Sequence, residues 1–377
     1  MRLPAGDRVA VVMAIAGMFG AISSAACRST QPPPSVVTVD ASAAPNATST
    51  NQPQAVATTP GRLSTPTELP EHCPDPHLTP LPASPTRKPI ATPTEPPPGA
   101  TPEPTRPIRL HEVDDVPPLP PVDLPPLRPD AALYQLIRDR VGGDAQHYAI
   151  VIKDLTSGRG VAIDPGRVLY AASLFKMEVM LEIFHQREAG LLDFSERYVA
   201  SDYYASFDLG PHRLSQCQAV SIGDALAAMM SVSDNVAAVM LQDRAGPRHI
   251  NAAMAALGLE ETRLTEDGSL PATAGDMARL IEAIARGSAV SDTASKDMTA
   301  LMETEEIDDR IPRHLPEGTR VAHKTGNWED ATHDAGIVYG KRSTYVMVLM
   351  SDLGFDSDAA SVEADLARIA WDYFEGP

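Results

Sequence analysis

The chain of 377 residues carries a formal net charge of −19 at pH 7, and 21% of its residues are charged. Its first 129 residues hold 9 Lys and Arg against 11 Asp and Glu, so nearly all of the negative charge falls on the remainder. A domain this acidic repels phosphate groups, which argues against nucleic acid and anionic lipid as partners.

Residues 1–27 have the pattern of an export signal. Basic residues near the start accompany an apolar stretch at residues 9–22, which is too short to span a bilayer comfortably. Small residues then lead to Cys27, which resembles a bacterial lipoprotein signal whose cysteine becomes lipidated. Ordinary signal cleavage after Ala25 or Ala26 is the alternative. We therefore expect an extracytoplasmic protein, either anchored in the cell envelope through lipid or secreted.

Residues 28–129 are rich in proline and are predicted to form a disordered tether. Of the 36 prolines in the chain, 28 fall between Gln31 and Asp130, in runs joined by Ser, Thr and Ala. Such a segment cannot bury enough apolar surface to fold and favours extended, partly polyproline II conformations. One globular domain remains, over residues 130–377, and its size allows a substantial core.

The chain has three cysteines. If Cys27 carries lipid, Cys73 in the tether and Cys217 in the domain remain as an even pair. Export would permit a disulfide between them, and two free thiols are the alternative. Because no C-x-x-C spacing or histidine-rich cluster occurs, we expect no metal and no cofactor.

The order of helical and strand patterns in the domain predicts an α+β fold. A helix is expected at residues 130–143, followed by a hairpin that turns at residues 156–158. Strands at both ends of the domain then flank a helical middle, which predicts one antiparallel sheet built from both ends with an inserted all-helical subdomain. The further elements expected are helices at 173–188, at 221–246 with a break at 233–235, at 272–287 with Thr273 as cap, and at 361–374, and strands at 319–326, 333–340 and 342–352.

Residues 171–181 place Ser173 and Lys176 three positions apart where a helix should begin. Residues at this spacing share a helix face, so the Lys176 amine can take the proton of the Ser173 hydroxyl and make it a strong nucleophile. Backbone N–H groups at the helix N-terminus also lie where an oxyanion could form. Alone, this pattern is weak evidence, because a capping serine and a surface lysine produce it by chance.

Two further short motifs follow in the domain. Ser233–Asp234–Asn235 interrupts two predicted helices, and such a break exposes a hydroxyl and an amide together. Lys324–Thr325–Gly326 ends a predicted strand. Each motif has an ordinary interpretation, the first as a turn that doubles as a helix cap and the second as a strand ending beside a solvated lysine.

Together and in this order, S-x-x-K, S-D-N and K-T-G resemble the signature of class A β-lactamases and penicillin-binding proteins. The resemblance to these penicillin-recognising serine hydrolases covers residues 131–375 and is closest to class A. It implies a β-lactamase/transpeptidase-like fold. It also implies a β-lactam, or the D-alanyl-D-alanine peptide that a β-lactam mimics, as the substrate. We expect a monomer whose only contact with a membrane is the lipid anchor.

The resemblance implies that four residues carry out acylation. Ser173 would attack an amide carbonyl and form an acyl-enzyme, with Lys176 as the proton acceptor. Ser233 would relay the proton to the leaving nitrogen, and Asn235 would hold Lys176 and the substrate amide. A second cation at Lys324 would lower the pKa of Lys176 and favour its neutral form.

The resemblance also assigns the binding of the substrate. Lys324 and Thr325 would bind its carboxylate by charge and by hydroxyl. Gly326 would let the strand edge approach the substrate closely. The backbone N–H groups of Ser173 and Asn327 would make the oxyanion hole.

The chain departs from class A in the loop that releases the acyl group. In class A an E-x-x-L-N pattern supplies the glutamate that activates water. The corresponding segment here, residues 262–277, is short and lacks this pattern. Glu266 is a possible deacylating group, and a solvated acid on a turn is the other interpretation; Asp267 lies beside it. His333 is a second departure, either lining the cleft or serving as a strand-end histidine whose hydrogen bonds are satisfied.

Three functions are compatible with these patterns. The first is a class A-like β-lactamase whose deacylating group is displaced. The second is a slow penicillin-binding DD-peptidase or esterase acting on cell-wall substrates, which β-lactams acylate and trap. The third is a non-catalytic cell-wall binding protein, against which the complete set of motif residues argues.

Overall fold

The computed structural model describes residue 73 and residues 116–376, apart from 208–209, 211–212 and 355–356. The expected export signal, the expected lipidation site at Cys27 and most of the expected tether lie outside these residues. None of the helices in the described ranges is both long and apolar enough to cross a bilayer.

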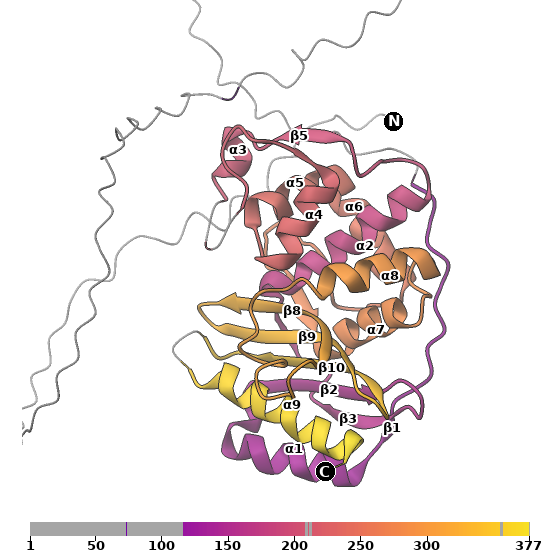
Figure 1. The fold of residues 1–377 in the computed structure, drawn as a ribbon, viewed down its shortest axis with the longest axis vertical. Helices are drawn as coiled ribbons and strands as arrows, with labels where there is room; N and C mark the ends of the chain where they lie inside the picture. Colours follow the sequence, from indigo (N-terminus) through magenta and orange to yellow (C-terminus); the bar gives the residue numbers. More distant parts are fainter. Residues whose placement is uncertain (1–72, 74–115, 208–209, 211–212, 355–356, 377) are drawn as a thin grey trace, which may run out of the picture. The chain divides into compact units, whose positions relative to one another are not determined.

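A six-stranded sheet forms the centre of the domain (Figure 1). In spatial order its strands are β1 (Arg128–Pro129), β3 (Arg159–Ile163), β2 (Tyr148–Asp154), β10 (Thr344–Ser351), β9 (Ala331–Tyr339) and β8 (Arg320–Trp328). All neighbouring strands are antiparallel except the short β1, which runs parallel to β3. Strands from before and after the helical insertion therefore share one sheet, which confirms the predicted α+β fold class.

Helices cover both faces of the sheet (Figure 1). On one face, α1 (Ala131–Val141) and α9 (Ala359–Glu375) share an apolar cluster with β2 and β10, and an ion pair of 2.7 Å joins Arg140 to Asp365. The other face meets α7 (Ala274–Ala285), which contacts β2, β9 and β10. Because β2 and β10 are covered on both sides, they consist of continuous apolar runs and not of alternating ones.

The inserted helical part is built around α2 (Phe175–Glu188), of whose 14 residues 11 are buried. The expected break is present between α4 (Ile222–Ser231) and α5 (Asn235–Ala245), and Oγ1 of Thr273 caps α7 by accepting from N of Asp276 at 3.1 Å. Not expected from the patterns were α3 (Asp202–Ala205), α6 (Pro247–Ala256) and α8 (Asp292–Met302). The remaining elements are η2 (Gly142–His147), η3 (Ala172–Leu174) and two small sheets, β4 (Val168–Tyr170) with β7 (Pro271–Thr273) and β5 (Arg197–Val199) with β6 (Ala219–Ser221).

The packed part of the chain begins before the expected boundary at residue 130. Leu119 and Val122 are buried in the larger apolar core, and Nη2 of Arg279 donates to the backbone O of Val122 at 2.7 Å. A proline-rich composition did not reveal this segment, because its few apolar residues are buried against the domain and not against each other.

Cys73 and Cys217 form a disulfide. Of the two alternatives that the composition left open, the structure therefore has the paired form. The bond ties a point 57 residues before Asp130 in the sequence to the helical part of the domain.

Candidate active site

Ser173 lies in the short turn η3, between the small β4–β7 sheet and α2. The turn is held at its start by a hydrogen bond of 2.8 Å from N of Ala171 to O of Leu270. Ala172 has a positive φ of 46°, a conformation that residues other than glycine seldom adopt and that is often found at functional sites. Because α2 starts directly afterwards, Lys176 falls on its first turn, beside Ser173.

The side chain of Lys176 is completely buried and contacts polar groups of two motifs. Its Nζ lies 3.0 Å from Oγ of Ser173, 2.8 Å from Oγ of Ser233 and 2.8 Å from Oδ1 of Asn235. The backbone O of Ser233 lies 2.6 Å away. The structure therefore brings together all four residues to which the family resemblance gives a part in acylation.

These contacts suit a neutral Lys176. Burial, and next the positive charge of Lys324, hold the pKa of Lys176 well below its usual range. A neutral amine has two N–H groups and one lone pair, and the carbonyl O of Ser233 and the amide O of Asn235 can only accept. If these two oxygens take the N–H groups, the lone pair is left for the hydroxyl of Ser173 or of Ser233, as a general base requires.

Asp234 holds the break between α4 and α5 in place. Its buried side chain caps α5, since Oδ1 accepts from N of Ala237 at 2.9 Å, and Oδ2 accepts from N of Leu214 at 2.9 Å. The preceding Ser233 has a positive φ of 61°. The middle residue of the motif thus fixes the backbone, while Ser233 and Asn235 on either side of it contact Lys176.

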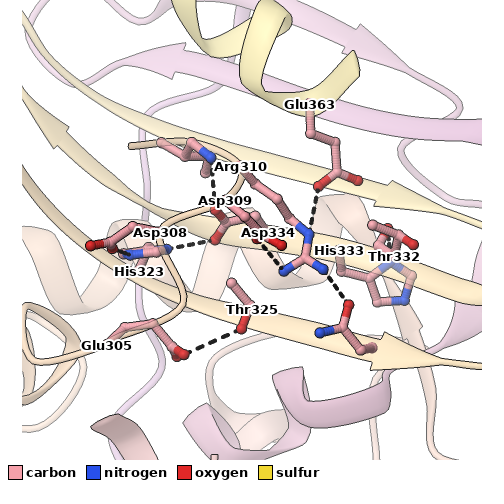
Figure 2. Close-up of polar contacts among 12 residues, drawn as sticks. Glu305, Asp308, Asp309, Arg310, His323, Thr325, Thr332, His333, Asp334 and Glu363 are labelled. Carbon is pink, nitrogen blue, oxygen red and sulfur yellow. Dashed lines mark hydrogen bonds and ion pairs between the residues drawn. The ribbon is translucent and has the colours of Figure 1, made fainter. Parts of the chain in front are cut away.

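Lys324 and Thr325 lie on β8 and contact a buried acid. Nζ of Lys324 donates to Oε2 of Glu305, which lies between α8 and β8. Oγ1 of Thr325 donates to Oε1 of the same carboxylate at 3.3 Å, as Figure 2 shows. The two residues expected to bind a substrate carboxylate therefore bind a carboxylate of the chain itself.

Gly326 and His333 are paired across β8 and β9 and lie against the turn that carries the nucleophile. A Cβ at Gly326 would lie 3.2 Å from O of Ala171, so the glycine allows the strand to approach that turn. Nε2 of His333 lies 2.8 Å from O of Tyr170, and Nδ1 lies 2.7 Å from O of Thr332 and 3.2 Å from N of Ser351. Burial lowers the pKa of His333 to about 4, so the ring is neutral, and its single N–H can donate to only one of these two carbonyls.

A buried arginine fixes the end of β8 (Figure 2). Nη2 of Arg310 donates to Oδ1 of Asn327, and its Nη1 lies 3.2 Å from Oδ1 of Asp309. Its Nε lies 3.7 Å from Oε2 of Glu363 on α9, whose pKa burial raises well above the usual range. The side chain of Asn327, whose backbone N–H is expected in the oxyanion hole, is thereby held from the side of the sheet.

The loop expected to carry a deacylating acid does not bring Glu266 to these residues. N of Gly268 donates to O of Thr265 at 3.2 Å, which closes a turn on which Glu266 and Asp267 are exposed. Within the described part of the chain, neither acid forms a hydrogen bond with a motif residue. The loop contacts the turn that carries the nucleophile through its backbone, since O of Leu270 accepts from N of Ala171 at 2.8 Å.

Residues 132–374 match the Beta-lactamase enzyme family. The chain belongs to this family. The matched region includes all three motifs and the whole sheet except β1. No curated protein sequence matches the chain significantly.

Solved structures of similar fold agree with this assignment. PBP-A is 23% identical, with a TM-score of 0.62, and the match covers 68% of this chain and 100% of that chain. A PBP-A variant, described as an acyl-enzyme complex with penicillin G, is 24% identical with a TM-score of 0.61, covering 67% and 100%. A β-lactamase from Sphaerobacter thermophilus is 22% identical with a TM-score of 0.59, covering 64% and 96%. These likenesses establish the β-lactamase/transpeptidase-like fold.

The sequence patterns did not indicate Glu305 or Arg310. Both fall in residues 303–310, a stretch with five acids that is typical of a solvated loop. Glu303 and Glu306 are in fact exposed, and no local pattern distinguishes Glu305 from them. Only the packing of this stretch against β8 in this β-lactamase-family domain buries one acid and the arginine.

Proposed function

We propose that this member of the β-lactamase family is a serine hydrolase that forms an acyl-enzyme through Ser173. One observation carries the proposal: the buried amine of Lys176 contacts Ser173, Ser233 and Asn235 within 3.0 Å. A capping serine with a solvated lysine, the ordinary interpretation of S-x-x-K, does not account for a lysine with no exposed surface.

The proposed acylation follows from these contacts. Neutral Lys176 takes the hydroxyl proton of Ser173 while Oγ attacks the carbonyl carbon of the substrate. Backbone N–H groups of Ser173 and Asn327 stabilise the oxyanion. When the C–N bond breaks, Ser233 gives its proton to the leaving nitrogen and is reprotonated from Lys176, which returns the amine to its neutral form.

The acyl group is proposed to leave slowly. Hydrolysis of the ester needs a base that positions and activates water, and the two acids of the short loop, Glu266 and Asp267, are exposed on a turn without a hydrogen bond to a motif residue among the residues that the structure describes. This favours a slow penicillin-binding peptidase or esterase over an efficient β-lactamase. The complete, buried set around Lys176 is unnecessary in a non-catalytic cell-wall binding protein, so that function is the least supported.

The test is a time course of intact mass with benzylpenicillin. One adduct should appear, map to the peptide that contains Ser173, and decay more slowly than it forms. Ser173→Ala should form no adduct, whereas Ser195→Ala, at an exposed serine in the same domain, should behave as the unaltered protein does. An adduct that persists in Ser173→Ala would refute the assignment.

We further propose that the protein acts outside the cytoplasm and that Cys27 carries a lipid anchor. The support is the signal pattern of the first 27 residues and the Cys73–Cys217 disulfide, since such bonds persist in oxidising compartments. Incorporation of labelled palmitate in a bacterial host, lost in Cys27→Ala, measures the anchor. A protein released without label would be secreted only.

A further inference from the structure

The acid Glu305 contacts both side chains to which the family resemblance assigns the substrate carboxylate, Lys324 and Thr325. Its side chain has no exposed surface, and neither has that of Lys324. One carboxylate oxygen accepts from Nζ of Lys324 and the other accepts from Oγ1 of Thr325. The two oxygens of an anion are thus already bound to an ammonium and a hydroxyl, as those of a substrate carboxylate would be.

Beyond its pair with Glu305, Lys324 has little capacity to bind a second anion. A second hydrogen bond of its Nζ goes to the backbone O of Thr325 at 3.2 Å, and Thr325 itself is 1% exposed. The pair of Lys324 with ionised Glu305 carries no net charge. An incoming anion would therefore meet no excess positive charge from Lys324, and it would be repelled by Glu305 at close range.

Burial and the surrounding charges set the pKa of Glu305, and so the pH at which it ionises. Burial raises the pKa of Glu305, and Lys324 opposes that effect most strongly, followed by His323. Asp334 raises it further. His323 lies between Asp334 at 2.9 Å and Asp308 at 3.5 Å, which lift its pKa to about 9, so it is cationic at neutral pH. Burial lowers the pKa of Lys324, Glu305 opposes that effect, and Arg310 adds to it. Three cations (His323, Lys324 and Arg310) and three acids (Glu305, Asp308 and Asp334) therefore act on one another here, and Glu305 is the acid bound to the motif residues.

We propose that Glu305 is a specificity-determining residue that acts as an internal carboxylate, so that the enzyme prefers acyl donors without a carboxylate next to the scissile bond. The inference rests on the proposed serine hydrolase function and narrows its substrate class to neutral esters and amides. Penicillin-type substrates, which carry that carboxylate, acylate Ser173 more slowly than neutral esters and amides do.

Replacement of Glu305 by glutamine tests this directly. The amide keeps the shape and frees the charge of Lys324, so acylation by benzylpenicillin should accelerate about tenfold or more. Its methyl ester lacks the anion and should change by about twofold or less. Any effect of the substitution on the pKa of Lys176 alters both rates together, so the ratio of the two second-order rate constants isolates the carboxylate.

Glu306→Gln is the matched control, because Glu306 is the next residue, is exposed and pairs with Arg213 on the surface. It should leave the ratio unchanged. Equal changes for both substrates in Glu305→Gln, or a loss confined to benzylpenicillin, would overturn the inference. If the wild-type protein is acylated by neither compound, the proposed function fails, and the inference falls with it.

A second measurement serves if Glu305→Gln does not fold. In the wild-type protein, protonation of Glu305 as the pH falls should release Lys324, while protonation of Lys176 slows both reactions alike. The ratio of the rate for benzylpenicillin to that for its methyl ester should therefore rise as the pH is lowered from about 8 to about 5. A ratio that stays constant or falls would refute the role of Glu305.

Discussion

Lys176 is the residue on which the proposed chemistry depends, because its proton affinity decides whether Ser173 is activated. Two causes act in the same direction, the burial of the amine and the nearby cation of Lys324, whereas Glu305 and Asp234 raise its pKa. The spacing of Ser173 and Lys176 predicted that the two would meet. The burial could not be predicted from that spacing, since it arises from α5 and β8, which are remote in the sequence.

Acylation is expected to depend on pH through Lys176. Its neutral form is the base, so the rate for the methyl ester of benzylpenicillin should rise with pH through a single ionisation and then level off. Because the pKa is lowered, the plateau should be reached well below the ordinary range of a lysine amine. Stopped-flow measurements across pH give this profile.

Lys176→Arg supplies the control for that profile. A guanidinium stays protonated and cannot act as a base, so acylation should fall by about 10²- to 10⁴-fold at every pH. A rate that is independent of pH in the wild-type protein, or that is retained in Lys176→Arg, would contradict the role of Lys176 as proton acceptor.

At the scale of secondary-structure elements, clear apolar runs predicted helices and strands, whereas segments of mixed polarity did not. The break at residues 233–235 and the strands of the sheet other than β1 follow from runs of apolar residues that a short window captures, whereas β1 (Arg128–Pro129) lies in the segment predicted to be disordered. α8 begins with a polar stretch, Asp292–Lys296, and is stabilised by the cap of Ser291, whose Oγ accepts from N of Ala294 at 3.0 Å. Its apolar residues become informative only once α2, α4 and α7 are known to pack against it.

The loop before β7 leads to a prediction about release of the acyl group. Glu266 and Asp267 are exposed on a turn, so Glu266→Gln and Asp267→Asn should each change turnover of a chromogenic cephalosporin by about twofold or less. The unaltered protein should show a burst followed by slow turnover. Rapid turnover that Glu266→Gln abolishes would instead identify a β-lactamase with a rebuilt loop.

At the scale of the whole molecule, the site is assembled from segments that are far apart in the sequence. Residues 173–176 lie where the helical insertion begins, residues 233–235 lie within it, and residues 324–327 belong to the returning sheet. Each motif was recognisable because its residues are neighbours in the chain. Glu305 was not, because its partners Lys324 and Thr325 are 19 and 20 positions away and on another element.

The disulfide between Cys73 and Cys217 is expected to stabilise the domain. It closes a loop with a sequence separation of 144 residues, and removing a native disulfide typically costs about 2–5 kcal/mol, chiefly through the entropy of the unfolded chain. For a domain of this size each kcal/mol corresponds to about 2–4 °C in Tm, so Cys73→Ser with Cys217→Ser should lower Tm by about 5–15 °C. Cys27→Ser, at the remaining cysteine, should leave Tm unchanged. If the double variant melts at the wild-type temperature, the bond constrains only the segment before the domain. Its effect would then be to shorten the distance that the chain can span between the domain and any anchor at Cys27.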